Sequence, residues 1–375
     1  MFTILVASII AILLSGCVTE ENIKIGVLLP LTGDLGPIGE GMKKGAELAV
    51  FEINQQGGIN GRNVSLIVED TGTDPSKAAE AARKLIDVDK VQVIVGAAAS
   101  SCTLAAAQIA EKNKVVMVSP ASTSPKITEA GDYIFRNVGS DLLQGQALAD
   151  LAKAKGYKKA ATLVLNNDYG IGMEDVFKKH FSEVVKSVKY EKGKGDYRTE
   201  LEDIKSANPD VIMLVAYPES GSIILKQARE LDVKIDWIAA EGIADTKMFD
   251  NPQVATAMEG MLLTRPSSPK NDPNYQKFLN SYKQKYGNDP GIYADYTYDA
   301  VNLVSKAIEE GGYNGESIKN ALFKVSEHYK GATGDKTFDE NGDMKSQFYE
   351  IIVAKNKTFE SIGSWTLETG IELLQ

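Results

Sequence analysis

Short apolar runs alternate with amphipathic segments along the first third of the chain. Apolar stretches at residues 23–29, 64–69, 91–96 and 115–119 have the length and β-branched composition of buried strands. Between them, residues 38–53, 76–88 and 104–113 repeat their apolar positions at helical spacing. This alternation predicts an α/β fold, in which helices cover both faces of a doubly wound parallel sheet.

The same alternation restarts near residue 160 and predicts a second lobe of the same kind. The expected strands are residues 160–165, 184–190, 211–216 and 235–239, and the expected helices are 173–181, 198–206 and 222–231. A strand near residue 262, three helices (274–286, 293–309 and 317–325) and a hairpin (347–354 with 359–365) follow. Because these late elements need a lobe to pack on, we expect the chain to cross between the lobes more than once and to form a hinge.

Small hydroxyl residues follow two neighbouring strands of the predicted first lobe. Ser100 and Ser101 come after the strand at 91–96, and four more serines and threonines lie at 119–124. Parallel strands carry ligands at their carboxyl ends, and a helix N-terminus favours a small anion there. Ser100 could bind such an anion or serve only as a helix N-cap, and these residues alone leave both readings open.

Three candidate residues follow strands of the predicted second lobe. Tyr169, Tyr217 and Glu241 each come shortly after one of its strands, so they should face the same crevice as the hydroxyl residues of the first lobe. Taken singly, each could instead be an ordinary surface aromatic or a solvated charge.

Composition and charge narrow the possible functions. The chain has 375 residues, 43% hydrophobic and 25% charged, which is the length of about two domains. Its net charge of −10 argues against nucleic acid as a partner. Only two histidines occur, without metal-ligand spacing or a nucleophile motif, so we predict no metal, no cofactor and no enzymatic activity. The glycines at 39, 41 and 45 lack the spacing of a dinucleotide-binding loop.

The N-terminal residues have the pattern of an export signal. Residues 1–14 are apolar but too short to span a bilayer comfortably, and Leu14-Ser-Gly-Cys17 resembles a bacterial lipobox. We therefore predict a signal peptide of residues 1–17 ending at a diacylated Cys17, which would anchor the exported protein to the outer face of the cytoplasmic membrane. An uncleaved anchor is the alternative. Cys102 is the only other cysteine, so the exported part has no disulfide within the chain.

Long motifs in the chain resemble the branched-chain amino-acid-binding family, the type I periplasmic binding proteins of ABC importers. They include Ile23-Lys-Ile-Gly-Val-Leu-Leu-Pro-Leu-Thr-Gly33, Met117-Val-Ser-Pro-Ala-Ser-Thr123, Asn167-Asp-Tyr-Gly170 and Tyr293-Ala-Asp-Tyr-Thr-Tyr-Asp-Ala-Val301. The resemblance implies two lobes joined by a three-segment hinge. Residues 18–140 plus 266–343 would form lobe 1, and residues 141–265 plus 344–375 would form lobe 2.

The resemblance also implies a ligand and the residues that bind it. The carboxylate of an amino acid would be bound by Ser100, Ala121 and Thr123, and its ammonium group by Glu241. Tyr169 and Tyr217 would line the cleft, and the weaker candidates are Ser101, Ser122, Ile38 and Tyr293. Ile38 stands where some members carry a bulky aromatic side chain.

The function that the resemblance implies is that of an exported, monomeric binding protein. It would capture a small apolar amino acid, branched-chain above all, and deliver it to the permease of an ABC importer. The alternative is a sensor module for an amide or a small organic acid.

Overall fold

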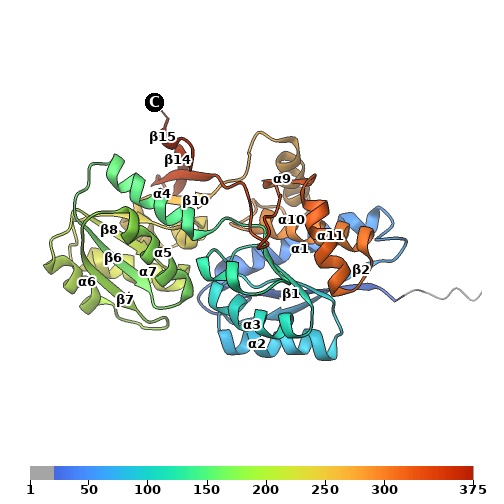
Figure 1. Ribbon diagram of the computed structural model, residues 1–375. Coiled ribbons are helices and arrows are strands. Elements are labelled where there is room, and N and C mark those ends of the chain that lie inside the picture. The colour runs from blue at the N-terminus through green and yellow to red at the C-terminus, as the bar shows by residue number, and fades with distance from the viewer. Residues whose placement is uncertain (1–20, 375) are drawn as a thin grey trace, which may run out of the picture.

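The computed structural model describes residues 21–374, which fold around two β-sheets (Figure 1). The first sheet has five parallel strands in the order β2-β1-β3-β4-β5. They are β1 (Ile23–Leu29), β2 (Val64–Asp70), β3 (Val93–Gly96), β4 (Val116–Ser119) and β5 (Ile134–Arg136). We call this sheet and the helices packed on it lobe 1. Cys17 and the predicted signal peptide lie outside the described residues.

Helices cover both faces of the sheet in lobe 1. Val93 and Val95 pack on one side and Ile94, between them, on the other, as the pleat of a strand requires. The side of Ile94 is covered by α2 (Pro75–Arg83) with its extension η1 (Lys84–Val88) and by α3 (Ser100–Lys112). The other side is covered by α1 (Gly36–Gln55), α10 (Ala294–Gly311) and α11 (Gly315–Ser326). The short elements η2 (Pro125–Glu129), β11 (Lys330–Gly331) and β12 (Gly334–Asp335), with α9 (Pro273–Tyr286), complete the lobe.

The second sheet, the core of lobe 2, has eight strands in the order β15-β14-β13-β10-β9-β8-β6-β7. Five of them are parallel: β6 (Ala160–Leu165), β7 (Val184–Tyr190), β8 (Val211–Val215), β9 (Asp236–Ala239) and β10 (Leu262–Pro266). The others extend the sheet in antiparallel fashion: β13 (Tyr349–Lys355), β14 (Thr358–Thr366) and β15 (Gly370–Leu373). The helices are α4 (Asp141–Ala154), α5 (Asp168–His180), α6 (Arg198–Ser206), α7 (Pro218–Glu230) and α8 (Pro252–Met258), with η3 (Glu241–Ile243) and η4 (Thr246–Asp250).

The chain passes between the lobes three times. It leaves lobe 1 after β5, returns after β10, and enters lobe 2 again before β13. We call residues 137–140, 267–272 and 344–348 the crossing segments; together they form the hinge side of the molecule. The domain boundaries after residues 140, 265 and 343 stay a prediction from the sequence.

The two lobes are in contact across the cleft, so the structure is a closed form. Polar contacts from lobe 1 to lobe 2 join Asp34 to Ser220 (2.9 Å between the carboxylate and the amide nitrogen), the Thr73 carbonyl to Lys192 (2.6 Å) and the Ser124 hydroxyl to the Asp168 carbonyl (2.8 Å). Among residues 21–374, no helix is long and apolar enough to cross a membrane.

Candidate ligand-binding site

Ser100 and Ser101 lie at the edge of lobe 1 that faces lobe 2, as the sequence predicts. The Ser100 hydroxyl accepts a hydrogen bond from the backbone N–H of Ser124 (3.3 Å), and the Ser101 hydroxyl accepts one from the N–H of Asp168 in lobe 2 (3.2 Å). Ser100 is not the N-cap of α3: the cap residue is Ala99, and no side chain caps this helix. The N-cap reading of Ser100 is therefore wrong, because its hydroxyl turns toward the neighbouring loop.

Ser122 holds the loop after β4 in place. Its hydroxyl lies 2.7 Å from the Thr103 hydroxyl and donates to the carbonyl of Ala98 at 3.0 Å. Ala98 belongs to the exit of β3 and Thr103 to the first turn of α3, so Ser122 ties the loop after β4 to the segment that follows β3. Ala121, next to it, is buried in the apolar cluster that also contains the cleft tyrosines.

Two buried carboxylates face the cleft from lobe 2. Glu241, in η3, is 3% exposed and accepts a hydrogen bond from Gln144 (2.7 Å). Asp141, the first residue of α4, is fully buried and accepts a hydrogen bond from the Thr123 hydroxyl (2.9 Å). Thr123, predicted from the sequence, and Asp141, which was not, thus form one contact across the hinge end of the cleft.

The surroundings of these carboxylates are rich in hydrogen-bond acceptors that lack donors. Asp141 Oδ1 and Gln144 Oε1 are buried without a hydrogen-bond partner. The Gln144 amide cannot be turned over to supply a donor, because its nitrogen already donates to Glu241 and to the Thr264 carbonyl (3.0 Å). Among the described residues, no Lys or Arg forms an ion pair with Asp141 or Glu241. Buried acceptors without donors are costly, so this end of the cleft fits a ligand group that brings several N–H donors.

Burial disfavours the charge of both carboxylates. It raises the pKa of Asp141 well above its usual value, and the neighbouring charge of Glu241 raises it further, while the Thr123 hydrogen bond opposes the shift. The pKa of Glu241 is raised by burial too, and hydrogen bonds from its neighbours, Gln144 among them, oppose that rise. A cation placed between the two groups would restore the ionised form of both.

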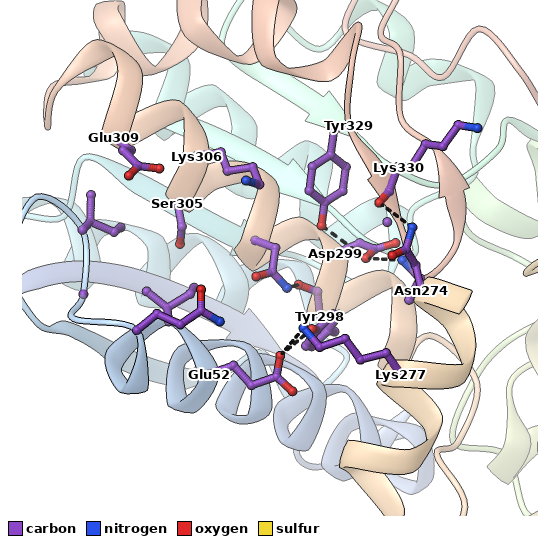
Figure 2. Close-up of a pocket in the computed structure, with 17 residues that line it drawn as sticks. Glu52, Asn274, Lys277, Tyr298, Asp299, Ser305, Lys306, Glu309, Tyr329 and Lys330 are labelled. Atoms are coloured by element: carbon purple, nitrogen blue, oxygen red, sulfur yellow. Dashed lines mark hydrogen bonds and ion pairs between the residues drawn. The ribbon is translucent and has the colours of Figure 1, made fainter. Parts of the chain in front are cut away.

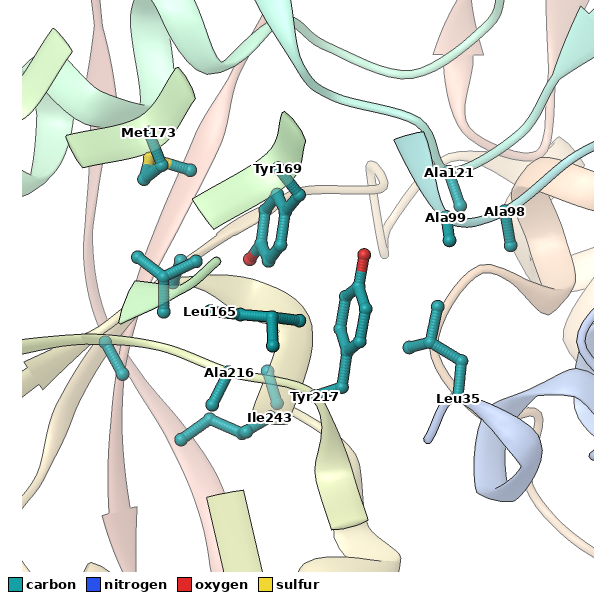
Figure 3. Close-up of a cluster of buried hydrophobic side chains, with 14 of the residues drawn as sticks. Leu35, Ala98, Ala99, Ala121, Leu165, Tyr169, Met173, Ala216, Tyr217 and Ile243 are labelled. Carbon is teal, nitrogen blue, oxygen red and sulfur yellow. The ribbon is translucent and has the colours of Figure 1, made fainter. Parts of the chain in front are cut away.

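Aromatic and small apolar side chains form the wall beside this polar end (Figure 3). Tyr169 and Tyr217 stack with their ring centroids 5.5 Å apart and an interplanar angle of 2°. The Tyr217 hydroxyl points toward Ala99 and Ala121 of lobe 1, and Leu35 lies beside the same ring (Figure 3). Ile38 is buried in the same apolar cluster. The structure thus brings the predicted residues of both lobes to one place.

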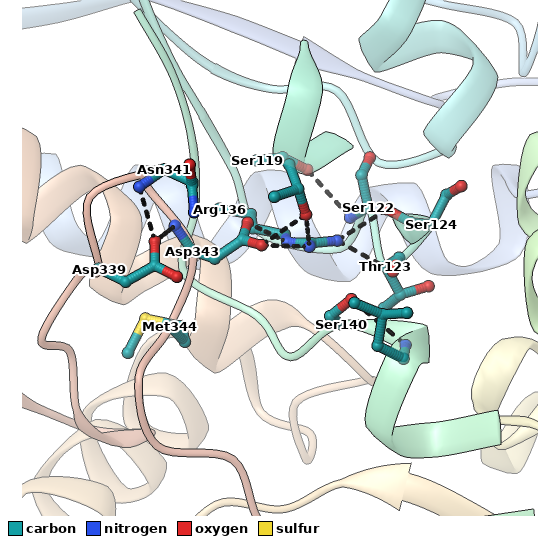
Figure 4. Close-up of polar contacts among 12 residues, drawn as sticks. Ser119, Ser122, Thr123, Ser124, Arg136, Ser140, Asp339, Asn341, Asp343 and Met344 are labelled. Carbon is teal, nitrogen blue, oxygen red and sulfur yellow. Dashed lines mark hydrogen bonds and ion pairs between the residues drawn. The ribbon is translucent and has the colours of Figure 1, made fainter. Parts of the chain in front are cut away.

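Arg136, at the end of β5, fixes the loop that carries Thr123 (Figure 4). It is fully buried, and all five of its N–H donors are used. One nitrogen donates to the carbonyls of Thr123 (2.9 Å) and Ser124 (2.8 Å). The others donate to Thr128 (2.9 Å) and, as a two-point pair, to both carboxylate oxygens of Asp343 (2.6 Å each). Arg136 therefore joins the cleft loop to the start of the third crossing segment.

A separate cavity of about 360 Å³ lies between α1, α9 and α10, on lobe 1 (Figure 2). None of the predicted site residues lines it. Glu52 there accepts a hydrogen bond from Tyr298 (2.8 Å) and lies 3.5 Å from the Lys277 ammonium. Glu52 in this cavity is thus paired with a cation, unlike the carboxylates of the cleft.

Sequence reasoning missed Asp141 and Gln144. Asp141 follows Ser140, which caps α4 by accepting from the N–H of Leu142 (3.3 Å), so the pair reads as a helix start with an acidic first turn. The available signal was its position directly after the first crossing segment, where a side chain can reach the cleft from the hinge.

A two-lobed fold with hydroxyls on one side of a cleft and carboxylates and aromatics on the other defines a solute-binding protein. Residues 22–357 match the family described as "Periplasmic binding protein", and the chain belongs to this family. The sequence-based identification of the family is thereby confirmed.

Similar proteins of known name bind leucine and related amino acids. The chain is 30% identical to the "Leucine-, isoleucine-, valine-, threonine-, and alanine-binding protein" of Pseudomonas aeruginosa, over 87% of this chain and 88% of that protein. The crystal structure of a leucine-binding protein, LivK, from Thermotoga maritima matches with a TM-score of 0.86 at 32% identity, covering 92% of this chain and 99% of that one.

A second solved structure confirms the predicted fold class. It is the branched-chain amino acid transporter substrate-binding protein LivJ of Streptococcus pneumoniae, in complex with isoleucine. It matches with a TM-score of 0.85 at 27% identity, over 94% of this chain and all of that one. A benzoate-bound solute-binding protein of R. palustris, at 22% identity and a TM-score of 0.84, shares the fold alone.

Proposed function

We propose that the protein captures an α-amino acid with an apolar side chain in its inter-lobe cleft and delivers it to an ABC importer. The observation that carries this proposal is the pair of buried carboxylates, Asp141 and Glu241, surrounded by acceptors without donors. An ammonium group has three N–H donors and a positive charge. It complements this end of the cleft in both hydrogen bonding and charge, whereas an anionic group does neither.

The other parts of an amino acid have counterparts in the cleft. Ser100 and the N-terminus of α3 would bind the carboxylate, because a hydroxyl and free N–H groups favour an anion. Ala121 and Thr123 would contact the amino acid backbone from the same lobe. The apolar side chain would lie against Tyr169, Tyr217 and Leu35.

The rival ligand class is a small organic acid or amide, bound for sensing or transport. An organic acid would bring a third negative charge into a cleft with two buried carboxylates and no ammonium group to compensate for it, which costs free energy. The importer is favoured over a sensor because the named relatives include a transporter substrate-binding protein.

Calorimetric titration of the protein from Val18 onward tests the ligand class. We expect leucine, isoleucine or valine to bind at least about thirtyfold more tightly than 4-methylpentanoate, which is leucine without its ammonium group. Benzoate serves as the second comparison. If 4-methylpentanoate or benzoate binds as tightly as the best amino acid, the proposal is wrong.

We also propose that Cys17 is lipidated and holds the protein at the outer face of the cytoplasmic membrane. Cys17→Ser should then move the protein from the membrane to the soluble fraction. Unchanged membrane retention would point to an uncleaved anchor.

A further inference from the structure

A second cavity lies on the hinge side of the molecule, and none of the predicted site residues lines it. Its volume is about 460 Å³, and all three crossing segments contribute to its walls. The lining includes Asn137 and Gly139 of the first segment, Ser267 and Pro269 of the second, and Met344, Ser346, Gln347 and Phe348 of the third. A cavity of this size holds a molecule built on one ring.

One residue at this cavity carries a buried acceptor without a donor. Asn137 is fully buried, and its Oδ1 has no hydrogen-bond partner. The orientation of this amide is fixed, because its nitrogen donates to the carbonyl of Tyr296 (2.8 Å) and a flipped amide would place two oxygens together. Asn137 Oδ1 can therefore still accept a hydrogen bond, and a donor bound there would be favourable.

A donor with unused capacity lies at the same residue. The ammonium group of Lys336, which also lines the cavity, donates to the Asn137 backbone carbonyl (3.0 Å) and lies 4.7 Å from the centroid of the Tyr296 ring. An ammonium has three N–H bonds, so at least one can still donate. The negative charges of Asp299, Asp295 and Asp335 already act on this group, so it has little need of an anion from outside.

Part of the remaining wall is apolar, beside the polar residues Ser267, Thr333, Asp335, Ser346 and Gln347. Pro266, Pro269, Met344 and the ring of Tyr296 line it. Phe348 also lines the cavity and is 47% exposed, so part of its ring is open to contact with an occupant. A flat apolar body fits these walls, and a single group that both donates and accepts fits the polar corner.

We propose that the hinge cavity is a second small-molecule site that takes a phenol or a compact apolar alcohol. The hydroxyl of the occupant would donate to Asn137 Oδ1 and accept from Lys336 Nζ, and its ring would lie between Pro269 and Phe348. The occupant would touch all three crossing segments, so it would stabilise the present hinge angle. This site is independent of the amino acid proposed for the cleft.

The probe for the test is p-cresol, and toluene is its counterpart without the hydroxyl. Crystals of the protein soaked in p-cresol should show the ring between Pro269 and Phe348 with its oxygen at hydrogen-bond distance from Asn137 Oδ1. In calorimetry, p-cresol should bind at least about threefold more tightly than toluene, the effect of one added hydrogen-bonded group. A crystal with only ordered water at Asn137, or with p-cresol only in the inter-lobe cleft, overturns the proposal.

Two variants separate the polar and apolar parts of the site. Asn137→Ala should weaken p-cresol binding about three- to tenfold and leave toluene unchanged, while Phe348→Ala should weaken both. Phe51→Ala is the matched control, because Phe51, in lobe 1, is likewise a half-exposed phenylalanine (44%) and does not line the cavity. If Asn137→Ala does not fold, equal binding of p-cresol by Phe348→Ala and the parent still refutes the site. In small-angle scattering without an amino acid, the protein should have a smaller radius of gyration with p-cresol than without it. If crystals show p-cresol in the cavity but the radius of gyration does not change, the effect on the hinge is refuted.

Discussion

Glu241→Gln should turn a cleft that selects amino acids into one that binds them weakly. Glutamine has the size of glutamate, and its carbonyl oxygen can accept from Gln144, which now donates to Glu241 at 2.7 Å. The substitution therefore removes a charge and leaves the packing in place. In our proposal the ligand ammonium then faces Asp141 alone. Removing one partner of a buried, hydrogen-bonded charge pair costs ~2–5 kcal/mol, or roughly thirty- to several-thousand-fold in affinity.

The assay is calorimetric titration of the parent, Glu241→Gln and Asp141→Asn with leucine and with 4-methylpentanoate. Both variants should lose leucine affinity in the range above. Neither should lose affinity for 4-methylpentanoate, because that ligand has no ammonium group and meets one negative charge fewer. The ratio of the two affinities in one variant is insensitive to small changes in folding, so it reports the ammonium site itself.

A matched control is Glu174→Gln. Glu174 is also a fully buried carboxylate of lobe 2, but it pairs with Lys178 (2.9 Å) and accepts hydrogen bonds from Thr162 and Ser187 on the outer part of the lobe. We expect it to lower the melting temperature and to leave the leucine affinity unchanged. The reasoning fails if Glu241→Gln binds leucine within about threefold of the parent, under ~0.7 kcal/mol, or if the control loses as much affinity as Glu241→Gln.

Three further predictions concern residues around the cleft and the hinge. Arg136→Lys keeps the charge but loses the two-point pair with Asp343. We expect a stability loss of ~1.5–3 kcal/mol and weaker leucine binding in calorimetry. Arg198→Lys, at an exposed ion pair, should change neither the stability nor the leucine affinity. Asp34 accepts a hydrogen bond from the first turn of α7, whose own N-cap side chain makes no cap bond. Asp34→Ala should therefore weaken closure and ligand affinity by ~0.5–2 kcal/mol. Asp272→Ala, which removes the N-cap of α9, should lower stability alone. Burial lowers the pKa of Lys336 to about 8, so the folded protein releases this proton more readily than the unfolded chain. Stability should therefore rise as the pH rises from about 8 toward 10.5, by at most ~1.4 kcal/mol per pH unit, and denaturant titration of Lys336→Met should show a smaller slope in this window.

The alternation of strands and helices made most of the fold predictable from sequence. All four strands predicted for the beginning of lobe 1 are present. For the three late helices the sequence predicted only that they pack on one of the lobes, and the structure places them on lobe 1. Helix α4 was not predicted, because its apolar residues spread around the helix and eight of its residues are buried. Helix α3 begins at Ser100, four residues before its predicted start, because small hydroxyl residues carry no apolar periodicity.

Only those residues of the candidate site that follow the end of a strand could be predicted from the sequence. Ser100, Thr123, Glu241 and the cleft tyrosines follow strand ends, so the rule for parallel sheets could point to them. Asp141 comes from a crossing segment, and the role of Arg136 depends on Asp343, 207 residues later in the chain. Contacts between such distant residues are set by the paths of the crossing segments, which no local pattern encodes.

The contacts of the closed form suggest how capture depends on the ligand. Three contacts favour closure: Asp34 with Ser220, Lys192 with the Thr73 carbonyl, and Ser124 with the Asp168 carbonyl. Each consists of one or two hydrogen bonds of modest net stability. The burial of Asp141 and Glu241 without a cation opposes closure, since both lose hydration and repel each other. In our proposal an ammonium group removes this opposition and an anion increases it. The same two carboxylates would then decide both which ligand is bound and whether the lobes stay closed, so affinity and closure should change together in every variant of this pair.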